Sequence, residues 1–361
     1  MQIKGKIMSK HRLLKKEQKL AMILLLPSFI LLFLIAFYPL ISVFNTSITN
    51  KTFASSIETE NVGLDNYKKL LSLKIMKLEP LFDDSGVQVI DEKTGEKIYE
   101  DPIDILPRKP NRYKEISQFN FFNNHYVLGA SDPSFVLSIK DTVSFTIISV
   151  FLETIFGMAI ALIMVQNFPF RGGLRVAMLV PWAIPTAVSS RMWEWMFAST
   201  RVGIINVISQ IFGWTNGQFP FLTSSSTQVW AMIAIDVWKT TPFMALLIMA
   251  GLQTIPSAIY ESAEIDGCNA FQRFWKMTLP LVKDTVVVAL VFRTLDALRV
   301  FDLFQIVFAQ KRYSMASFAY YQLIDNKAMG YSSAASVIIF VIILIFILLY
   351  TRISGGIGNE K

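Results

Sequence analysis

Long apolar runs separated by polar segments dominate the pattern of this chain. The runs cover residues 20–48, 136–166, 174–198, 228–252, 284–309 and 331–352. A helix needs about 20 apolar residues to cross the hydrocarbon core of a bilayer. The pattern therefore predicts an all-α integral membrane protein with six transmembrane helices. The first run is longer than the core of a signal peptide and lacks a clear cleavage site, so we expect it to be a retained helix.

Basic residues set the expected orientation of these helices. Of the formal net charge of +7, +6 falls in residues 1–19, directly before the first apolar run. Lys and Arg beside a membrane helix favour the cytoplasmic side, so we interpret this segment as a cytoplasmic anchor rather than an arm that binds nucleic acid. Arg171 and Arg175 mark the loop after 136–166 as cytoplasmic as well. Six crossings then place both termini, including the tail 353–361, in the cytoplasm.

The polar segment 49–135 differs from the rest of the chain. It holds eleven Lys and Arg residues against fourteen Asp and Glu residues, a net charge of −3. The positive-inside rule places it outside, although long loops follow that rule weakly. Alternation at 87–90 and at 97–99, around a turn at 91–96, predicts a small β-hairpin. We expect an extracytoplasmic insertion followed by a core domain, 136–352.

Composition excludes several classes of site. The chain is 53% hydrophobic with a mean hydropathy of +0.46, more apolar than an average soluble domain. A single cysteine, Cys268, rules out a disulfide scaffold and a cysteine-based metal cluster. His11 and His125 are too few and too far apart in sequence to predict a metal site. No glycine-rich phosphate loop of the Walker type is present, so any ATP is expected on another chain.

The polar loop 253–283, between the fourth and fifth runs, predicts a pair of short helices. Pro256 ends the fourth run and Ser257 can cap a new helix. Glu261 and Glu264 lie in its early turns, where carboxylates suit the helix dipole. Gly267 can adopt a left-handed conformation and stop the helix.

A second short helix is expected to follow, capped by Asn269 and separated from the fifth run by Leu279 and Pro280. A soluble partner on the cytoplasmic face could grip such a helix pair and move two membrane helices through it. From the residues alone, an ordinary helical linker explains the loop equally well.

This loop resembles a known signature. The residues Glu261-Ser262-Ala263, Gly267 and Leu279-Pro280 are similar to the Glu-Ala-Ala, Gly and Leu-Pro pattern of ABC-importer permeases, and Asp266 lies directly before Gly267. Ser262 departs from the usual second alanine, but serine is also small. The resemblance implies that these seven residues form the coupling loop that docks into an ATPase subunit.

Further stretches resemble the carbohydrate-uptake branch of that family, of maltose/trehalose type. They are residues 62–67, 171–175, 180–185, 237–243 and 293–302. The resemblance covers nearly the whole chain except about 72–131. It implies one membrane-spanning half of the translocation path of a bacterial importer in the cytoplasmic membrane, taking up a di- or oligosaccharide. A non-sugar solute such as glycerol phosphate is the alternative.

The same resemblance implies the partners. They are a second homologous permease subunit, two cytoplasmic ATPase subunits that bind ATP and Mg, and an extracytoplasmic solute-binding protein. This chain is then expected to bind no cofactor or metal of its own. The insertion at 72–131 is expected to help dock the binding protein or stiffen the outer mouth, and a disordered loop is an equal alternative.

Charged residues inside the expected spans are the candidates for a solute path. Arg293, Asp296, Arg299 and Asp302 follow one another at intervals of three in the fifth run, and Asp236 and Lys239 form a similar pair in the fourth. Each charge at mid-membrane costs about 3 kcal/mol. These side chains are therefore expected to pair within and between helices, or to line a wet path.

Three tryptophans lie within the expected spans. Trp193, Trp195 and Trp238 could stack on sugar rings, but aromatic residues near span ends are more often interfacial anchors. A membrane-embedded transferase would need a convergent nucleophile, base or metal set, which the two separated histidines do not suggest. An ion channel or sensor would not need the helix pair. The sequence therefore favours a transport subunit over an enzyme.

Overall fold

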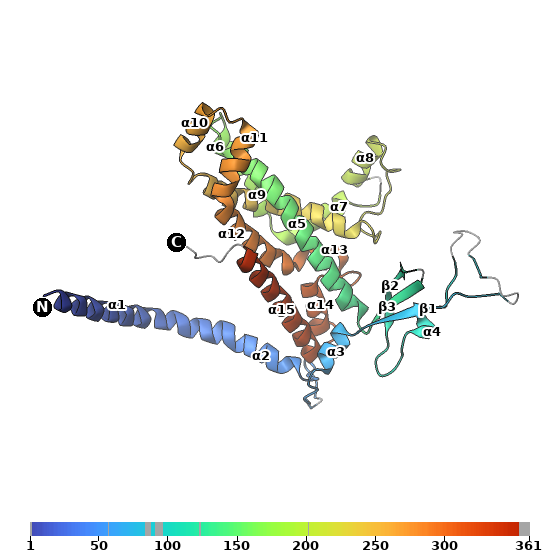
Figure 1. Ribbon diagram of the computed structural model, residues 1–361. Coiled ribbons are helices and arrows are strands. Elements are labelled where there is room, and N and C mark those ends of the chain that lie inside the picture. The colour runs from blue at the N-terminus through green and yellow to red at the C-terminus, as the bar shows by residue number, and fades with distance from the viewer. Residues whose placement is uncertain are drawn as a thin grey trace.

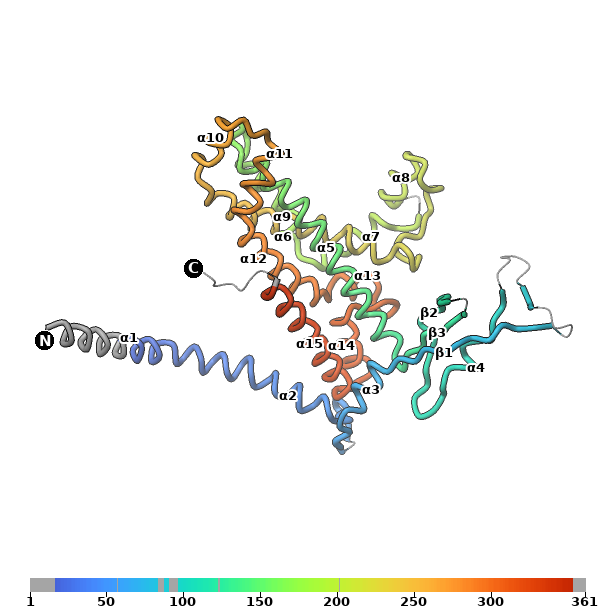
Figure 2. Tube along the Cα trace, in the orientation of Figure 1, coloured from blue at the N-terminus to red at the C-terminus, as the bar shows by residue number. Residues whose placement is uncertain are grey.

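The computed structural model describes residues 2–56, 58–83, 88–90, 97–122, 124–200 and 202–353, with side chains described from Glu17 to Arg352. Figure 1 shows a bundle of tilted helices with a small sheet at one end and two short helices at the other. The N-terminal helix projects from the bundle, as the trace in Figure 2 also shows.

Four helices are long and apolar enough to cross a membrane within the described residues. The first combines α1 (Gln2–Leu32), a π-helical stretch (Phe33–Phe37) and α2 (Tyr38–Ser47), and the others are α5 (Pro133–Val165), α9 (Gln228–Leu252) and α15 (Met329–Ile353). They match four of the six apolar runs. The first helix buries none of its apolar window against the rest of the chain, so its surface is left for lipid or another protein.

The run 174–198 was wrongly expected to form one continuous helix. It forms α6 (Arg171–Ala183) and α7 (Thr186–Met196), separated at Ile184 and Pro185. Ile184 is extended, with φ −68° and ψ 129°. A residue before proline is pushed out of the α region by the proline ring, and Pro185 itself cannot donate a backbone hydrogen bond. The dipeptide Ile184-Pro185 therefore explains the break between α6 and α7.

The run 284–309 is also interrupted. Helix α12 (Leu279–Leu298) ends at Arg299, and α13 (Asp302–Phe308) begins three residues later. Ser314, which caps α14 (Met315–Ile324), donates its hydroxyl to the carbonyl of Val300 at 2.6 Å. The charged ladder predicted for one helix is therefore divided between α12, its C-terminal cap and the start of α13.

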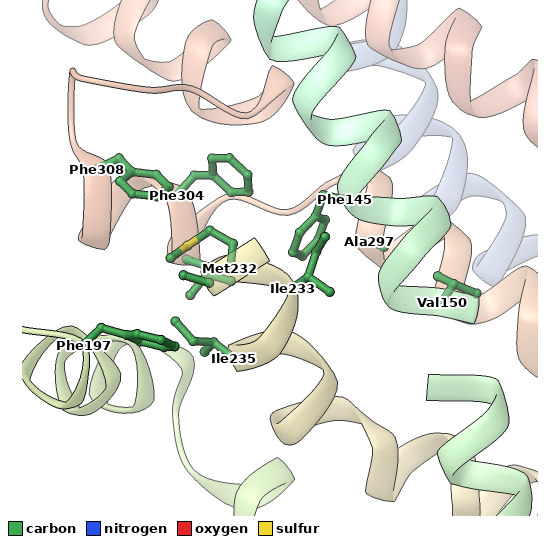
Figure 3. Packing of buried hydrophobic residues seen from close by; sticks show 11 residues of the cluster. Phe145, Val150, Phe197, Met232, Ile233, Ile235, Ala297, Phe304 and Phe308 are labelled. Carbon is green, nitrogen blue, oxygen red and sulfur yellow. The ribbon is translucent and has the colours of Figure 1, made fainter. Parts of the chain in front are cut away.

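The bundle core forms where α5 and α9 cross. Gly157 permits the approach, because a Cβ at that position would lie 2.9 Å from Cβ of Met244 on α9. Figure 3 shows the apolar cluster beside this crossing, in which Phe145 of α5 packs edge to face with Phe304 of α13 at 5.7 Å. The same cluster contains Met232 and Ile233 of α9. Three segments far apart in sequence are thus held together near the interrupted helices.

The insertion folds around a three-stranded antiparallel sheet. Strand β3 (Asn124–Ala130) lies between β1 (Leu73–Leu78) and β2 (Lys114–Phe121), with a register shift between Glu115 and Ser117. Two short helices flank the sheet, α3 (Asp65–Leu71) and α4 (Pro102–Ile105). The sheet buries Leu78, Leu106 and Val127. The prediction of an all-α chain is therefore wrong for the insertion.

The hairpin expected at 87–99 is visible in part. Ile90 and Lys97 form an antiparallel bridge, and Ile98 donates its backbone N–H to the carbonyl of Val89 at 2.9 Å. The turn at 91–96 and Val87 lie outside the described residues. Residues 97–122 contain α4 and β2, so the alternative of a disordered loop is wrong for this part of the insertion.

Candidate functional site

The loop between α9 and α12 forms two short helices that meet at a tight turn. Helix α10 (Ser257–Ile265) ends at Gly267, which has φ +77°. The N–H of Gly267 donates to the carbonyl of Glu264 at 3.0 Å, and that of Cys268 to the carbonyl of Ala263 at 2.9 Å. This bond pair is the Schellman motif, whose left-handed position favours glycine. The predicted role of Gly267 in the turn is confirmed by this geometry.

Asn269 caps the second helix, α11 (Ala270–Arg273), as the sequence predicted. It forms a reciprocal capping box with Gln272, at 2.8 and 3.0 Å. The expected cap at Ser257 is wrong, because Pro256 occupies the N-cap position and Ser257 already belongs to the helix. We call residues 257–273 the knob.

Leu279 and Pro280 do not separate the knob from the following span. Helix continues from α11 through a π-helical stretch, Phe274–Thr278, into α12. A proline inside a helix removes one backbone hydrogen bond, and a π-bulge is a common way to absorb such a defect. The knob is therefore connected to α12 by unbroken helix, which suits the transmission of a movement.

The knob has a braced interior and an exposed outer face. Ala263 is fully buried, and Glu264 forms an ion pair with Arg273 across the turn. Glu264, rather than Glu261, thus braces the pair. Ser262 satisfies its hydroxyl within α10 by donating to the carbonyl of Ala258 at 2.8 Å. Exposed side chains of the outer face include Glu261, Ser262, Ile265, Asp266 and Phe271, and Trp275 is exposed in the π-helical stretch that follows.

A polar cavity of about 460 Å³ lies where both interrupted helices meet α9. It brings together six of the seven intramembrane candidates: Asp236, Lys239, Arg293, Asp296, Arg299 and Asp302. Thr186 and Ser189 of α7 complete part of its wall. Trp238 is not part of this lining and packs edge to face on Trp193, with ring centroids 5.3 Å apart.

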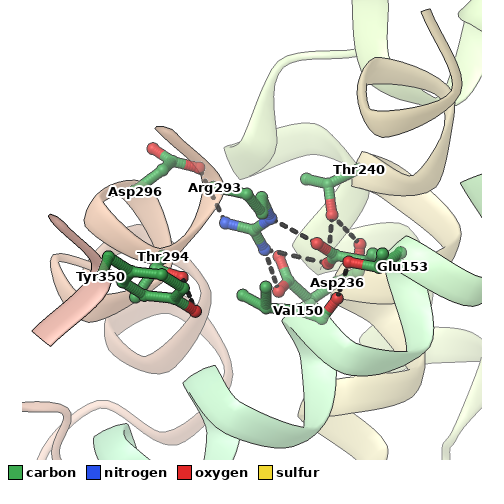
Figure 4. A network of polar contacts seen from close by, with 9 residues as sticks. Val150, Glu153, Asp236, Thr240, Arg293, Thr294, Asp296 and Tyr350 are labelled. Atoms are coloured by element: carbon green, nitrogen blue, oxygen red, sulfur yellow. Dashed lines mark hydrogen bonds and ion pairs between the residues drawn. The ribbon is translucent and has the colours of Figure 1, made fainter. Parts of the chain in front are cut away.

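Arg293 is the centre of a buried ionic network, shown in Figure 4. Its Nε donates to Glu153 Oε2 at 2.5 Å and its Nη2 to Glu153 Oε1 at 3.0 Å, while Nη2 also contacts Asp236. The Arg293 side chain is 2% exposed and that of Glu153 is 0% exposed. A guanidinium with this fork geometry suits a carboxylate well, so one side chain ties α12 to α5 and α9.

The ladder pairing predicted between Arg293 and Asp296 is present, with Nη1 and Oδ2 2.9 Å apart. Asp296 is nevertheless 71% exposed, so the buried partners of Arg293 are Glu153 and Asp236. Thr240 adds a bond to Glu153 Oε1 at 2.5 Å. Because Arg293 is enclosed by these groups, it braces the cavity wall, whereas Asp296 presents a charge to the cavity.

Lys239 has a different role from the one expected. Its Nζ donates to the carbonyl of Ile184 at 2.6 Å and to that of Trp182 at 3.4 Å. The predicted Asp236–Lys239 pair is therefore wrong, since Asp236 pairs with Arg293 instead. Lys239 satisfies carbonyls that the break between α6 and α7 leaves without helical partners.

Two parts of the polar framework were missed by sequence reasoning. Glu153 stands alone in the apolar run 136–166, and an isolated carboxylate inside a span is itself a signal of a buried partner. Arg312 binds Asp141 of α5 through both carboxylate oxygens, at 2.6 and 2.7 Å, and donates to Gln228 Oε1 at 2.6 Å. Nothing local in the sequence connects Arg312 with α5.

The site offers charged and hydrogen-bonding groups at the meeting point of α7, α9, α12 and α13. Among the described residues, no group of three or more His, Cys, Asp or Glu side chains could hold a metal ion. The geometry supplies a polar cavity beside a braced helix bundle and a connection from α12 to an exposed knob. Such an arrangement suits the movement of a polar solute.

Comparisons with known proteins agree with this arrangement. The family model described as "Binding-protein-dependent transport system inner membrane component" matches residues 153–358. The trehalose/maltose transport system permease protein MalF of Thermococcus litoralis is 42% identical over 235 residues, which are 63% of this chain and 78% of that protein.

Two longer matches include the insertion. The sulfoquinovosyl glycerol transport system permease protein SmoG of Agrobacterium fabrum is 28% identical, over 93% of this chain and 91% of that one. A chain of a bacterial alginate ABC transporter, in a crystal structure with an alginate pentasaccharide-bound periplasmic protein, matches 94% of this chain and 95% of its own length. Its TM-score is 0.66 at 18% identity, which is a likeness of fold.

Proposed function

The chain belongs to the family of binding-protein-dependent transport system inner membrane components, as a permease subunit of an ABC importer, and on this premise we propose that it imports a neutral di- or oligosaccharide. It is a multi-pass inner-membrane protein and not itself an enzyme, and hydrolysis of ATP belongs to a partner ATPase of the importer. The solute and the residues that act on it are the proposal.

The charge balance of the cavity supports a neutral solute. Its lining holds three cationic side chains, Lys239, Arg293 and Arg299, and three acidic ones, Asp236, Asp296 and Asp302. An anionic solute such as glycerol phosphate would favour an excess of cations, as Arg and Lys provide at phosphate sites. Hydroxyl groups of a sugar can accept from the cations and donate to the carboxylates. This balance is the observation on which the proposal mainly rests.

The knob is the proposed contact with the ATPase. Its outer face combines carboxylates with exposed apolar side chains, of which Ile265 is 86% and Phe271 71% exposed. Large apolar side chains that protrude from a small element are suited to a cleft in a partner. Two cytoplasmic ATPase subunits, binding ATP and Mg, would contact this chain and a second homologous permease.

The proposed topology has six crossings and both termini in the cytoplasm. The interrupted pairs α6–α7 and α12–α13 serve as the third and fifth crossings, with their breaks beside the cavity. Irregular backbone at membrane depth is acceptable where it lines a wet cavity. The insertion then lies on the outer side, where its sheet is suited to help dock the solute-binding protein or stiffen the outer mouth.

Stimulation of the ATPase tests the solute class. The assembled importer, with its binding protein, is reconstituted in vesicles and given maltose, trehalose or glycerol 3-phosphate. We expect one of the disaccharides to raise ATP hydrolysis and glycerol 3-phosphate to leave it at the basal rate. Stimulation by glycerol 3-phosphate alone would overturn the sugar assignment while leaving the importer assignment intact.

A further inference from the structure

A second polar cavity, of about 540 Å³, is lined by α13, by the turn that follows it and by α14. Its polar side chains are Gln305, Gln310, Lys311, Tyr320 and Asp325. None of them lines the cavity beside Arg293. Small-molecule sites have volumes of about 300–1,000 Å³, so this cavity has the size of a ligand site. We call it the α13–α14 cavity.

An aromatic pair connects the walls of the two cavities. Phe301 lines the cavity beside Arg293 and Tyr320 lines the α13–α14 cavity, and their ring centroids are 5.1 Å apart. Helix α13 also contributes to both walls, with Asp302 in the first and Gln305 in the second. Tyr320 is 42% exposed, so part of its ring is free to contact a ligand.

The polar groups of the α13–α14 cavity are only partly paired within the described chain. Lys311 and Asp325 both line it, yet they form no ion pair with each other there. Asp325 accepts a long hydrogen bond of 3.4 Å from Nε2 of Gln310. The amide oxygen of Gln305 is buried and has no hydrogen-bond partner among the described residues. A buried acceptor without a donor is costly, so a ligand that brings donors into this cavity is favoured.

The turn between α13 and α14 carries backbone strain at the edge of this cavity. Ala309 has φ +48° and ψ −117°, and the N–H of Lys311 donates to the carbonyl of Phe308 at 2.9 Å. This is a type II′ turn, whose first central position favours glycine because φ is positive. The strained turn places Gln310 and Lys311 in the cavity wall. Strain of this kind is concentrated at functional sites such as ligand clamps.

The lining favours an uncharged ligand that is rich in hydroxyl groups. The ammonium of Lys311 and the carboxylate of Asp325 balance each other, so neither an anion nor a cation gains a net attraction. An apolar ligand would leave the two amides without partners. Hydroxyl groups both donate and accept, so they can bond to the amides and to both charges. The free part of the Tyr320 ring suits the apolar face of a sugar ring.

Resting on the proposed function, we propose that the α13–α14 cavity is a second saccharide subsite of this permease. It holds a sugar unit on the other side of the Phe301–Tyr320 pair from the cavity beside Arg293. The ligand class is therefore the same in both cavities, a neutral saccharide.

Protection from alkylation tests this subsite in the assembled importer. Cys268→Ser removes the single cysteine, and Ile324→Cys then places a thiol in the cavity wall, where the native side chain is 49% exposed. Maleimide labelling is followed in millimolar maltose or trehalose, without the binding protein or ATP. A bound sugar slows labelling by the factor 1 + [L]/Kd, and we expect one of the disaccharides to slow it by about threefold or more. Thr223→Cys, at an exposed position outside the cavity, is the control and should react at the same rate with and without sugar.

Equal labelling rates of Ile324→Cys with and without either disaccharide would mean that the cavity holds water only, and would overturn the proposal. Stimulation of the ATPase by the same sugars reports separately on the proposed function. Stimulation without protection removes the subsite alone. Protection without stimulation supports the subsite and counts against import of these disaccharides.

Substitutions in the cavity wall supply a second readout. Asp325→Ala and Lys311→Ala each remove a charged hydrogen-bonding group, and each should raise the sugar concentration that gives half-protection by about fivefold or more. Asp65→Ala removes an exposed carboxylate of α3 and is the control, which should leave that concentration unchanged. Ala309→Gly relieves the positive φ without removing a contact group and should retain protection. Unchanged half-protection with both charge variants would contradict the subsite.

Discussion

Arg293 of α12 and Glu153 of α5 form a doubly hydrogen-bonded ion pair between two side chains that are almost fully enclosed. The pair connects positions 140 residues apart in the sequence. A charge in such surroundings is stable only while its partner remains.

Replacing Arg293 should destabilise the bundle. Arg293→Ala leaves Glu153 and Asp236 facing each other without a cation, and breaking a buried pair costs about 3–5 kcal/mol. We expect a large fall in the thermal unfolding midpoint of the purified protein. Arg299→Ala is the control, because Arg299 is exposed and, within the described part of the chain, donates to the carbonyl of Leu295. Equal midpoints for the two variants would contradict the bracing role.

Glu153 should be as important as Arg293, and Asp296 should not. Glu153→Ala removes the fully buried partner, whereas Asp296→Ala removes a partner that is 71% exposed and well solvated. We predict poor recovery of the folded protein for the first variant and near-normal recovery for the second. The comparison is made by size-exclusion chromatography in detergent. A stronger defect with Asp296→Ala would show that the ladder pair, not the buried pair, holds the site.

Lys239 should stabilise the break between α6 and α7. Lys239→Met keeps much of the side-chain volume but leaves the carbonyls of Ile184 and Trp182 without this donor, at a cost of about 1–3 kcal/mol. We expect reduced transport and faster proteolysis near the break. Lys239→Arg retains donors and should recover part of the activity. If the methionine variant transports normally, the cap is dispensable.

The long apolar runs predicted much of the fold. Helices α5, α9 and α15 could be predicted from the length and hydropathy of their runs. The helix pair of the knob could be predicted from Gly267 and Asn269, because turn and cap residues act locally. The break at Pro185 carried a local signal too, because proline restricts the residue before it.

Contacts between residues far apart in the chain could not be predicted from the sequence pattern. The pairing of β1 with β3, and of Arg312 with Asp141, joins residues separated by tens to more than a hundred positions. Glu153 illustrates the difference, because its isolation in an apolar run indicates a partner without saying which one. The cavity itself depends on how α9, α12 and the two breaks meet, and hydropathy does not determine that arrangement.

The ion pair inside the knob should contribute little by itself. Glu264 is 62% exposed and Arg273 25% exposed, and partly exposed pairs are worth up to about 1 kcal/mol. Arg273→Ala should therefore weaken ATPase binding by less than about fivefold, since a tenfold change corresponds to about 1.4 kcal/mol. Surface-immobilised ATPase and the detergent-solubilised permease give that affinity. A loss beyond tenfold would mean that Arg273 contacts the ATPase directly.

Substitutions at Gly267 can separate the effect of backbone strain in the turn from the effect of contact with the ATPase. A Cβ at Gly267 would meet nothing within 4 Å in this chain, so a larger residue is opposed only by the positive φ and by the partner. Gly267→Asn tolerates that φ, whereas Gly267→Val does not. Gly213→Val is the control, because Gly213 also has a positive φ and open space around it but lies outside the knob, just after α8 (Ile204–Ile211), which Figure 1 shows well apart from α10.

Recovery of the ATPase with these variants, measured beside sugar uptake, tests the central claim that this permease is driven through the knob. We predict that Gly267→Val stays in the membrane while ATPase recovery and uptake fall together by at least tenfold. Gly213→Val should retain ATPase binding, and Gly267→Asn should fall between them. Normal ATPase recovery and normal uptake with Gly267→Val would contradict the claim and leave the knob an ordinary linker.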